Sequence, residues 1–169
     1  MLKRLIDEQV IVYRKTNLVK SEVFSERMQK LMNQYINSMI NNQIVIEELM
    51  KIAKEIQQSR EEGNELGLSD EELAFYDALT KPQAIKDFYE NKELVELTKE
   101  LTETLRKNKT IDWQKREPAR AKMRMMIKKL LKKYKYPPEG QEDAIETVML
   151  QCELWTDNQE MSIDYIATV

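Results

Sequence analysis

The side chains best suited to chemistry in this sequence are the lysines and arginines of residues 115–135. Ten basic residues lie in this segment against one acidic residue, Glu117, which gives a local net charge of +9. At about 100° per residue, a helix would place the apolar side chains of this segment on one arc and most of the basic ones on the opposite arc. The candidate basic surface comprises Lys122, Arg124, Lys128, Lys129, Lys132 and Lys133. A surface of this kind could contact DNA phosphates or an acidic protein partner.

The same basic arc could instead be a solvated face whose charge is neutralised by neighbouring helices. Residues 139–169 carry eight acidic residues and no basic ones, so acidic neighbours are available within the chain. We favour the neutralised face, although Met125 lies within the basic arc, where it gains nothing from water, and this favours contact with a partner. The charge environment of the helix separates the two interpretations, because acidic groups of 139–169 that covered it would weaken the DNA hypothesis.

Most catalytic and metal chemistry is excluded by the residue inventory. The sequence contains no histidine, which removes Ser-His-Asp triads, Cys-His dyads and His-ligated zinc sites. The acidic clusters at 70–72 and 142–143 stand at predicted helix starts, where they complement the helix dipole. No EF-hand loop and no glycine-rich phosphate loop is present. We therefore assign no catalytic, cofactor-binding or metal-binding residue, and the chain is not expected to be an enzyme by itself.

Composition predicts an all-α protein. The 169 residues are 34% charged and 41% hydrophobic with only 3 Gly and 4 Pro, a balance rich in helix formers and suited to a single domain. The single cysteine, Cys152, lies in an apolar helical stripe, which indicates a core residue and a reducing compartment. The sequence contains neither an uncharged apolar run long enough to span a membrane nor the apolar region of a signal peptide. We therefore expect a cytoplasmic protein with no membrane partner.

The first third of the chain predicts two helices. Residues 2–15 carry an apolar stripe without an upstream cap, and we expect the chain to be a fragment of a larger subunit. One long helix is expected over 25–60, as the spine of the bundle. Its inner stripe comprises Met28, Leu31, Met32, Tyr35, Met39, Ile46, Leu49, Met50, Ala53 and Ile56. The apolar residues off that stripe, which would face other neighbours, are Ile36, Ile40, Ile44, Val45 and Ile52. Residues 41–43 interrupt its apolar surface; they are either an exposed polar turn, which we favour, or a polar layer that sets the register against neighbouring helices. The run 61–67, with two glycines, is expected to end this helix.

The rest of the chain predicts shorter helices with recognisable structural anchors. Ser69 and Glu72 form a capping box before a short helix, and Pro82 begins another through Phe88 and Tyr89. Helices follow over 93–107, 118–134 and 141–155, and 157–169 is a weakly patterned tail. The predicted structural anchors are Ser69, Glu72, Trp113, Pro118, Tyr136, Pro137 and Pro138. Asp112 is expected to interact with the N-terminal amides of the 118–134 helix. The predicted fold is thus an irregular bundle of about six to seven helices around one long central helix.

Four blocks of sequence, in this order and at these separations, resemble the C-terminal region of the restriction (R) subunit of type I restriction–modification enzymes. They are Leu68–Leu79, Leu105–Trp113, Lys115–Arg120 and Leu131–Pro138. The resemblance covers about residues 1–155 and implies a helical domain that follows a nuclease domain and an ATP-dependent DNA translocase motor in the same subunit. The motor's phosphate-binding loop and the acidic and lysine residues of the nuclease have no counterparts here, so no catalytic residue can be carried over.

The resemblance also implies partners. It implies that this region helps to dock the R subunit onto the methyltransferase and specificity subunits, and that the motor and nuclease domains lie in cis. The full-length subunit would be an ATP-dependent type I site-specific endodeoxyribonuclease that requires ATP and Mg²⁺, whereas this chain would bind neither. Duplex DNA is the alternative partner, contacted by the basic helix at 115–135 during translocation.

Overall fold

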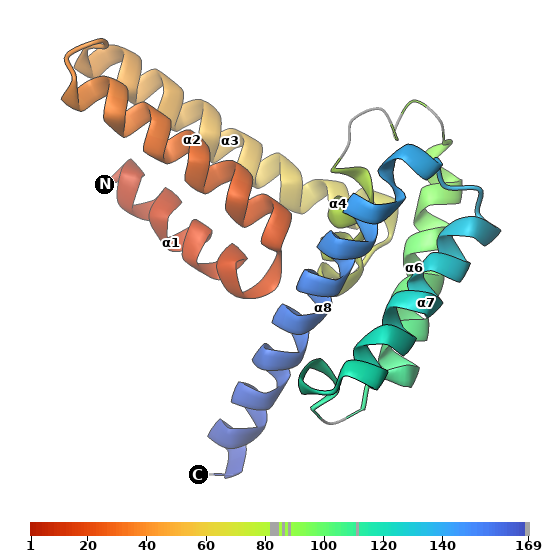
Figure 1. The fold of residues 1–169 in the computed structure, drawn as a ribbon. Helices are drawn as coiled ribbons and strands as arrows, with labels where there is room; N and C mark the ends of the chain where they lie inside the picture. Colours follow the sequence, from red (N-terminus) through yellow and green to blue (C-terminus); the bar gives the residue numbers. More distant parts are fainter. Residues whose placement is uncertain (82–84, 86, 88, 111, 168–169) are drawn as a thin grey trace. The chain divides into compact units, whose positions relative to one another are not determined.

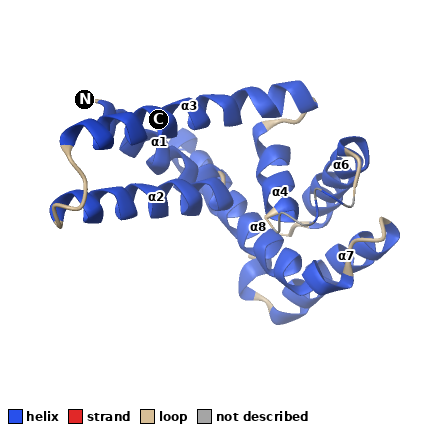
Figure 2. Ribbon diagram, turned by 90° about the horizontal axis from the view of Figure 1, so that it is seen from above, coloured by secondary structure: helices blue, strands red, loops and turns tan. Residues whose placement is uncertain are grey.

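The computed structural model describes residues 1–81, 85, 87, 89–110 and 112–167, with side chains up to residue 157. The predicted all-α class is confirmed, because the described residues form seven α-helices and one short 3-10 helix and include no strand (Figures 1 and 2). Most of the short helix predicted to begin at Pro82 and run through Phe88 lies outside the described residues. No helix of the described chain combines the length and the apolar character that spanning a bilayer requires.

The chain divides into two compact units, Met1–Gly67 and Leu68–Val169. The expectation that the whole chain is one domain, part of a larger subunit, stays a prediction.

Unit 1 consists of three helices that pack on one another. They are α1 (Leu2–Thr16), α2 (Leu18–Ile36) and α3 (Asn42–Leu66), and α1 contacts both α2 and α3. Asn17 separates the first two helices in an extended conformation, and its side-chain oxygen accepts a hydrogen bond of 3.1 Å from the backbone N–H of Lys20, which caps α2. The core of the unit comprises Ile6, Val10, Tyr13, Phe24, Met28, Leu31, Leu49, Ile52 and Ile56.

The single long helix predicted over 25–60 is wrong, because the chain turns between α2 and α3. Asn41 lies at the N-cap of α3, where its side-chain oxygen accepts a hydrogen bond of 3.0 Å from the backbone N–H of Ile44. Asn and Ser side chains bond readily to nearby backbone groups, so a run that contains Asn37, Ser38 and Asn41 stops a helix more easily than it continues one. Residues 41–43 are exposed, as the exposed-turn alternative expected, but only Asn41 lies outside the helices, since Asn42 and Gln43 form the first turn of α3.

The turn also resets the helical phase of the residues that follow it. Ile52 was expected off the inner stripe, yet it is 2% exposed and lies in the same core as the stripe residues Leu49 and Ile56. Ile46 and Met50 were expected on that stripe, yet they are 55% and 60% exposed. The helix α3 continues past residue 60 and ends at Gly67, within the predicted stop over 61–67, where the φ of 67° is the left-handed conformation that glycine adopts without strain.

Unit 2 is built around the short helix α4 (Asp70–Thr80), most of whose residues are buried. This helix contacts α6 (Asn91–Asn108) and α8 (Pro138–Ala167). The basic helix α7 (Glu117–Lys133) also contacts α6 and α8, and the 3-10 helix η1 (Trp113–Lys115) precedes it. The most buried large side chains include Phe75, Leu79, Leu94, Leu97, Leu101, Leu105, Trp113, Met123 and Ile127. Within this unit, α4 therefore has the central position that was predicted for the long helix.

The last helix is longer than the sequence pattern indicated. It begins at Pro138, because proline lacks only an N–H that the first turn of a helix leaves unpaired in any case. It continues to Ala167, so the backbone of most of the predicted tail is helical. Cys152 is 0% exposed on this helix, which confirms it as a core residue, and burial raises the pKa of its thiol to about 12.

Candidate functional site

Helix α7 is amphipathic, as the periodicity predicted. Its buried residues, Met123, Ile127, Leu130 and Leu131, lie on one stripe, and the helix packs against both α6 and α8. The opposite side is therefore turned to solvent. The six candidate residues of the basic surface fall into three groups on this side, one at each flank and one between them.

The flank next to α8 is neutralised. Arg124 forms ion pairs with Glu142 at 3.2 Å and with Glu146 at 2.5 Å, both on α8. Hydrogen bonding to Glu146 is the main reason that the pKa of Arg124 is raised, and Glu142 adds to it. Arg120, one turn before Arg124 on α7, pairs with Glu153, which lies about two turns beyond Glu146 on α8. The acidic segment thus covers this edge of the basic helix.

The flank next to α6 is neutralised by one carboxylate. The Nζ atom of Lys133 donates to Glu100 on α6 at 2.6 Å, and the hydroxyl of Tyr134 donates to the other oxygen of Glu100 at 2.5 Å. The bond from Lys133, and then the bond from Tyr134, lower the pKa of Glu100. The same carboxylate raises the pKa of Tyr134 to about 12, because it accepts a hydrogen bond from the neutral phenol and so stabilises the protonated form.

The residues between the two flanks form what we call the α7 crest: Lys122, Met125, Lys128, Lys129 and Lys132. All five are exposed, and Met125 is 58% exposed. None of the four lysines forms an ion pair with any side chain that the structure describes. Of the six candidate residues, Arg124 and Lys133 are therefore paired within unit 2, and the other four lie together on the crest. Such a row of ammonium groups can bind phosphates or carboxylates.

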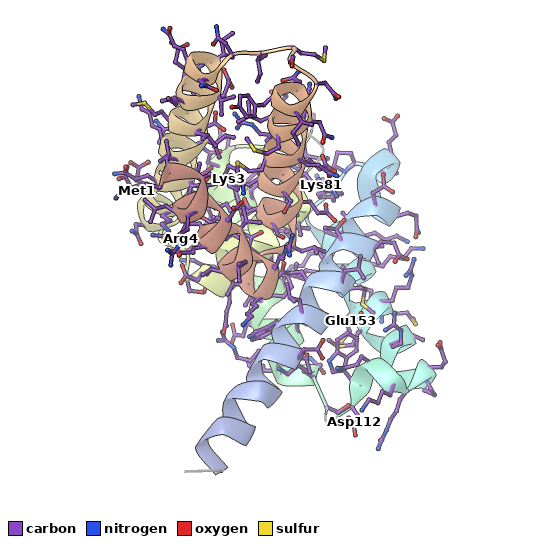
Figure 3. All side chains as sticks on the ribbon, turned by 90° about the vertical axis from the view of Figure 1, so that its left-hand side faces the viewer. Met1, Lys3, Arg4, Lys81, Asp112 and Glu153 are labelled. Carbon is purple, nitrogen blue, oxygen red and sulfur yellow. The ribbon has the colours of Figure 1, made fainter. Side chains whose placement is uncertain are left out.

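Trp113 is a buried anchor. Its side chain is 0% exposed, and its Nε1 atom donates a hydrogen bond of 3.0 Å to the Oγ1 atom of Thr156 on α8. Asp112 was expected to interact with the amides of α7, but this expectation is wrong. Its side chain, which is labelled in Figure 3, forms no cap. It pairs with Lys115 at 3.3 Å instead. Pro118 lies in the first turn of α7, which Arg116 precedes as the N-cap.

The other predicted anchors lie at the ends of helices. Ser69 is the N-cap of α4, and its hydroxyl accepts a hydrogen bond of 3.2 Å from the backbone N–H of Glu72. The reciprocal bond of a capping box is missing, because the Oε2 atom of Glu72 is buried without a partner among the described residues. Tyr136 is 2% exposed, and its hydroxyl donates to the carbonyl oxygen of Leu79 at 2.6 Å. Pro137 and Pro138 connect it directly to α8.

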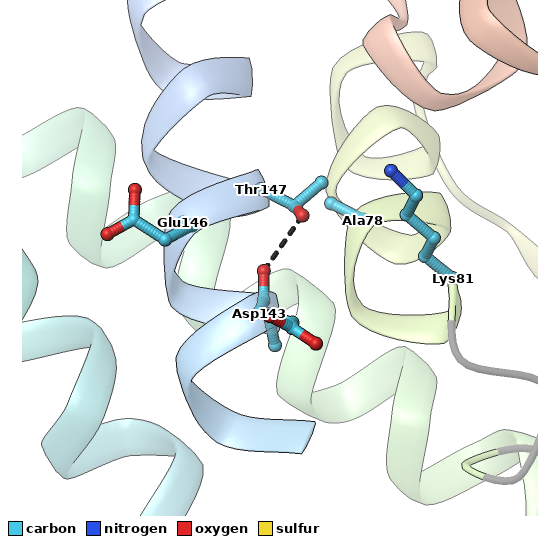
Figure 4. Close-up of a pocket in the computed structure, with 6 residues that line it drawn as sticks. Ala78, Lys81, Asp143, Glu146 and Thr147 are labelled. Atoms are coloured by element: carbon cyan, nitrogen blue, oxygen red, sulfur yellow. Dashed lines mark hydrogen bonds between the residues drawn. The ribbon is translucent and has the colours of Figure 1, made fainter.

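A shallow hollow lies between α4 and α8 in unit 2. Lys81, Asp143, Glu146 and Thr147 contribute its polar lining, and the Thr147 hydroxyl donates to the backbone carbonyl of Asp143 (Figure 4). Glu146 is already paired with Arg124. The described residues contain no group of three or more Asp, Glu or Cys side chains placed to hold a metal ion.

A second exposed surface, which was not predicted from the sequence, lies at the turn between α2 and α3. Ile36 is 75% exposed and Met39 is 71% exposed, and Tyr35, Ile44 and Ile46 are exposed beside them. The absence of charged residues from residue 31 to residue 46 is a feature of the sequence that could have indicated this surface. The assumption of a continuous helix had placed Tyr35, Met39 and Ile46 in a buried stripe.

The described residues thus form an all-α fold with a lysine crest in unit 2 and an exposed apolar turn in unit 1. The family model described as type I restriction enzyme HindI endonuclease subunit-like, C-terminal, matches residues 1–158, so the chain belongs to this family. The resemblance seen in the four sequence blocks is confirmed.

Two curated relatives agree with the family match. The chain is 41% identical over 152 residues to the type I restriction enzyme HindI endonuclease subunit of Haemophilus influenzae. The aligned region covers 90% of this chain and 14% of that protein. It is 34% identical over 134 residues to the putative type I restriction enzyme MjaIXP endonuclease subunit of Methanocaldococcus jannaschii, covering 79% of this chain and 13% of that protein. The chain thus spans about one-seventh of the length of these relatives. No solved structure matches it.

Proposed function

We propose that this chain is the non-catalytic C-terminal domain of a type I restriction endonuclease subunit, and that it joins this subunit to the methyltransferase–specificity core. The observation that supports the proposal most is the family match over residues 1–158, because the matched relatives are named as subunits of a multi-subunit enzyme. Docking requires exposed surfaces and no catalytic group. The described residues offer an apolar turn in unit 1 and a lysine crest in unit 2.

The activity of the whole subunit belongs to the same proposal. We expect an ATP-dependent endonuclease that acts on unmodified DNA, with its nuclease and motor domains outside this chain. ATP and Mg²⁺ would bind to those domains, since this sequence has no glycine-rich phosphate loop and its described residues form no metal-binding cluster.

A pull-down with the purified methyltransferase and specificity subunits of the same system tests the assembly role. The 169-residue chain should be retained by the core, and an endonuclease subunit that lacks these residues should be retained much less. The proposal fails if the chain is not retained while the shortened subunit binds as well as the complete one.

A second function is supported by the α7 crest, namely contact with duplex DNA during translocation. Its four lysines are exposed and have no acidic partner among the described residues, although the acids of α8 neutralise one flank. Phosphate contacts release counterions, so the affinity of such a surface should fall steeply between about 50 and 200 mM salt. The test is DNA binding by the charge-reversed variant Lys128→Glu with Lys132→Glu.

The matched control for that test is Lys30→Glu with Lys54→Glu, an equal change of charge at exposed lysines of unit 1. The crest variant should bind DNA at least tenfold more weakly than the wild-type chain and with a shallower salt dependence, whereas the control should differ less. Equal effects of the two variants would show a general dependence on net charge and would remove the crest from consideration.

A further inference from the structure

Among the described residues, the exposed large hydrophobic side chains are most closely spaced along the sequence at the turn between α2 and α3. We define the α2–α3 tip as Tyr35, Ile36, Met39, Ile44 and Ile46, which are between 41% and 75% exposed. Tyr35, Ile36, Met39 and Ile44 line one shallow hollow together with Ser38 and Asn41. Exposed aliphatic side chains gathered in this way commonly mark a protein-binding surface.

The tip is held in a defined shape by a helix-ending hydrogen-bond motif. Ser38 has a φ of 56°, the left-handed conformation, and its N–H donates to the carbonyl of Tyr35 at 3.0 Å. The N–H of Met39 donates to the carbonyl of Gln34 at 2.9 Å. These two bonds are those of a Schellman motif, which fixes the direction of the chain as it leaves α2. The apolar side chains are thus presented by an ordered turn.

The position of Met39 is unusual for this motif. The residue after the left-handed one normally packs back against the end of the helix. At the end of α7 the same motif forms around Lys135, and the following residue, Tyr136, is 2% exposed. Met39 holds the equivalent position in α2 but is 71% exposed. The fold of unit 1 therefore makes little use of the Met39 side chain.

The charge pattern specifies what kind of partner would fit. In a chain that is 34% charged, residues 31–46 contain no Asp, Glu, Lys or Arg. A surface for nucleic acid or for an acidic protein would carry cations, as the α7 crest does. The polar groups beside the tip are the exposed amides of Asn37, Asn41 and Asn42, which can donate and accept hydrogen bonds with any backbone. The complementary surface is therefore uncharged and apolar.

We propose that the α2–α3 tip is the part of this chain that docks on the methyltransferase–specificity core, against an uncharged, apolar face of that core. This inference rests on the proposed assembly function and assigns it to one surface. Protein interfaces have cores that are poor in charged residues and rich in aromatic residues and methionine, which matches the composition of the tip. The α7 crest is left free for a phosphate-bearing ligand.

Calorimetric titration of the 169-residue chain into the purified core tests this assignment. The variant is Ile36→Asp with Met39→Asp, which places two charges in the proposed contact at positions that are more than 70% exposed and so leave the fold intact. The control is Ile11→Asp with Val12→Asp, an equal change at exposed apolar residues of α1. Circular dichroism and thermal melting establish that both variants fold.

The tip variant should bind the core at least tenfold more weakly than the wild-type chain, and the α1 control should bind within about twofold of it. Unchanged binding by the tip variant overturns the inference but leaves the assembly function standing, with its surface elsewhere. A wild-type chain that does not bind the core overturns both. If sedimentation shows a wild-type dimer that the tip variant converts to a monomer, the tip joins two copies of this chain and the inference also fails.

Discussion

The indole nitrogen of Trp113 donates its hydrogen bond to the hydroxyl of Thr156, 43 residues away, at 3.0 Å. Both side chains are buried, at 0% and 4% exposure, and the bond ties η1 to α8. The same threonine hydroxyl donates in turn to the carbonyl of Cys152 at 2.9 Å. The segment that leads into the basic helix is therefore held by a buried polar bond as well as by apolar packing.

Replacing Thr156 by valine should destabilise the chain by about 1–3 kcal/mol, because the indole N–H would stay buried without an acceptor. Thr156→Ser is the control; it keeps the hydroxyl and should cost about 1 kcal/mol for the lost methyl group. Urea unfolding of both variants measures the difference. A valine variant that is no less stable than the serine variant would show that this bond contributes nothing.

The Glu100 cluster predicts how stability depends on pH. The pKa of Glu100 lies below its ordinary value of 4.5, because Lys133 and Tyr134 donate to its ionised form. A carboxylate of this kind contributes stability that is present above its ordinary pKa and is lost as the pH falls through its lowered pKa. The free energy of unfolding of the wild-type chain should therefore fall more steeply below about pH 4.5 than that of Glu100→Gln. Parallel curves for the two proteins would contradict this assignment.

Ser38 occupies a left-handed position that glycine adopts at no steric cost. Ser38→Gly should therefore leave the chain at least as stable, with a gain of at most about 1 kcal/mol, because relief of the backbone strain is partly offset by the entropy of the unfolded chain. Ser38→Val should instead be destabilising, since a β-branched side chain is strained in this conformation. Thermal unfolding of the two variants checks the order, and a valine variant more stable than the glycine variant would exclude the turn described here.

Arg124 should behave differently from the crest lysines despite lying on the same helix. Its ion pairs with Glu142 and Glu146 are partly exposed, so Arg124→Gln should cost at most about 1 kcal/mol of stability. It should also weaken DNA binding less than Lys128→Gln, because its charge is already neutralised within unit 2. Fluorescence anisotropy with duplex DNA compares the two variants. A larger loss of affinity for Arg124→Gln would place the DNA-contacting surface on the α8 flank.

The all-α class and the basic face of α7 could be predicted from the sequence, because both depend on the local periodicity of apolar and charged residues. The stripe of Met123, Ile127 and Leu131 is buried at the spacing that a helix requires. The pairing of Arg124 with α8 and of Lys133 with α6 depends on which helices become neighbours, and periodicity does not contain that information. The sequence showed that acidic residues were available as partners. It did not show which of the six basic residues would form ion pairs at the flanks and which would lie exposed on the crest.

The turn between α2 and α3 shows where periodicity misleads. The apolar pattern on both sides of residues 37–41 continues at nearly helical spacing, and it therefore predicted one continuous helix. The side chains of Asn37, Ser38 and Asn41, which favour the end of a helix, contradict that pattern. Once the chain turns there, the buried stripe of α3 differs from the predicted one: Ile46 becomes exposed and Ile52 becomes buried, while Leu49 and Ile56 are buried as predicted. The predicted core of unit 1 was therefore correct before the turn, at Met28 and Leu31, and partly wrong after it.

The affinity of the wild-type chain for the methyltransferase–specificity core, measured at two salt concentrations, distinguishes docking through the α2–α3 tip from docking through lysines. Docking through the uncharged α2–α3 tip should give saturable binding whose dissociation constant changes less than about threefold between 50 and 200 mM salt, because apolar contacts are not screened. The account is contradicted if no binding is detected, or if the affinity falls steeply with salt as it does for contacts made by lysines.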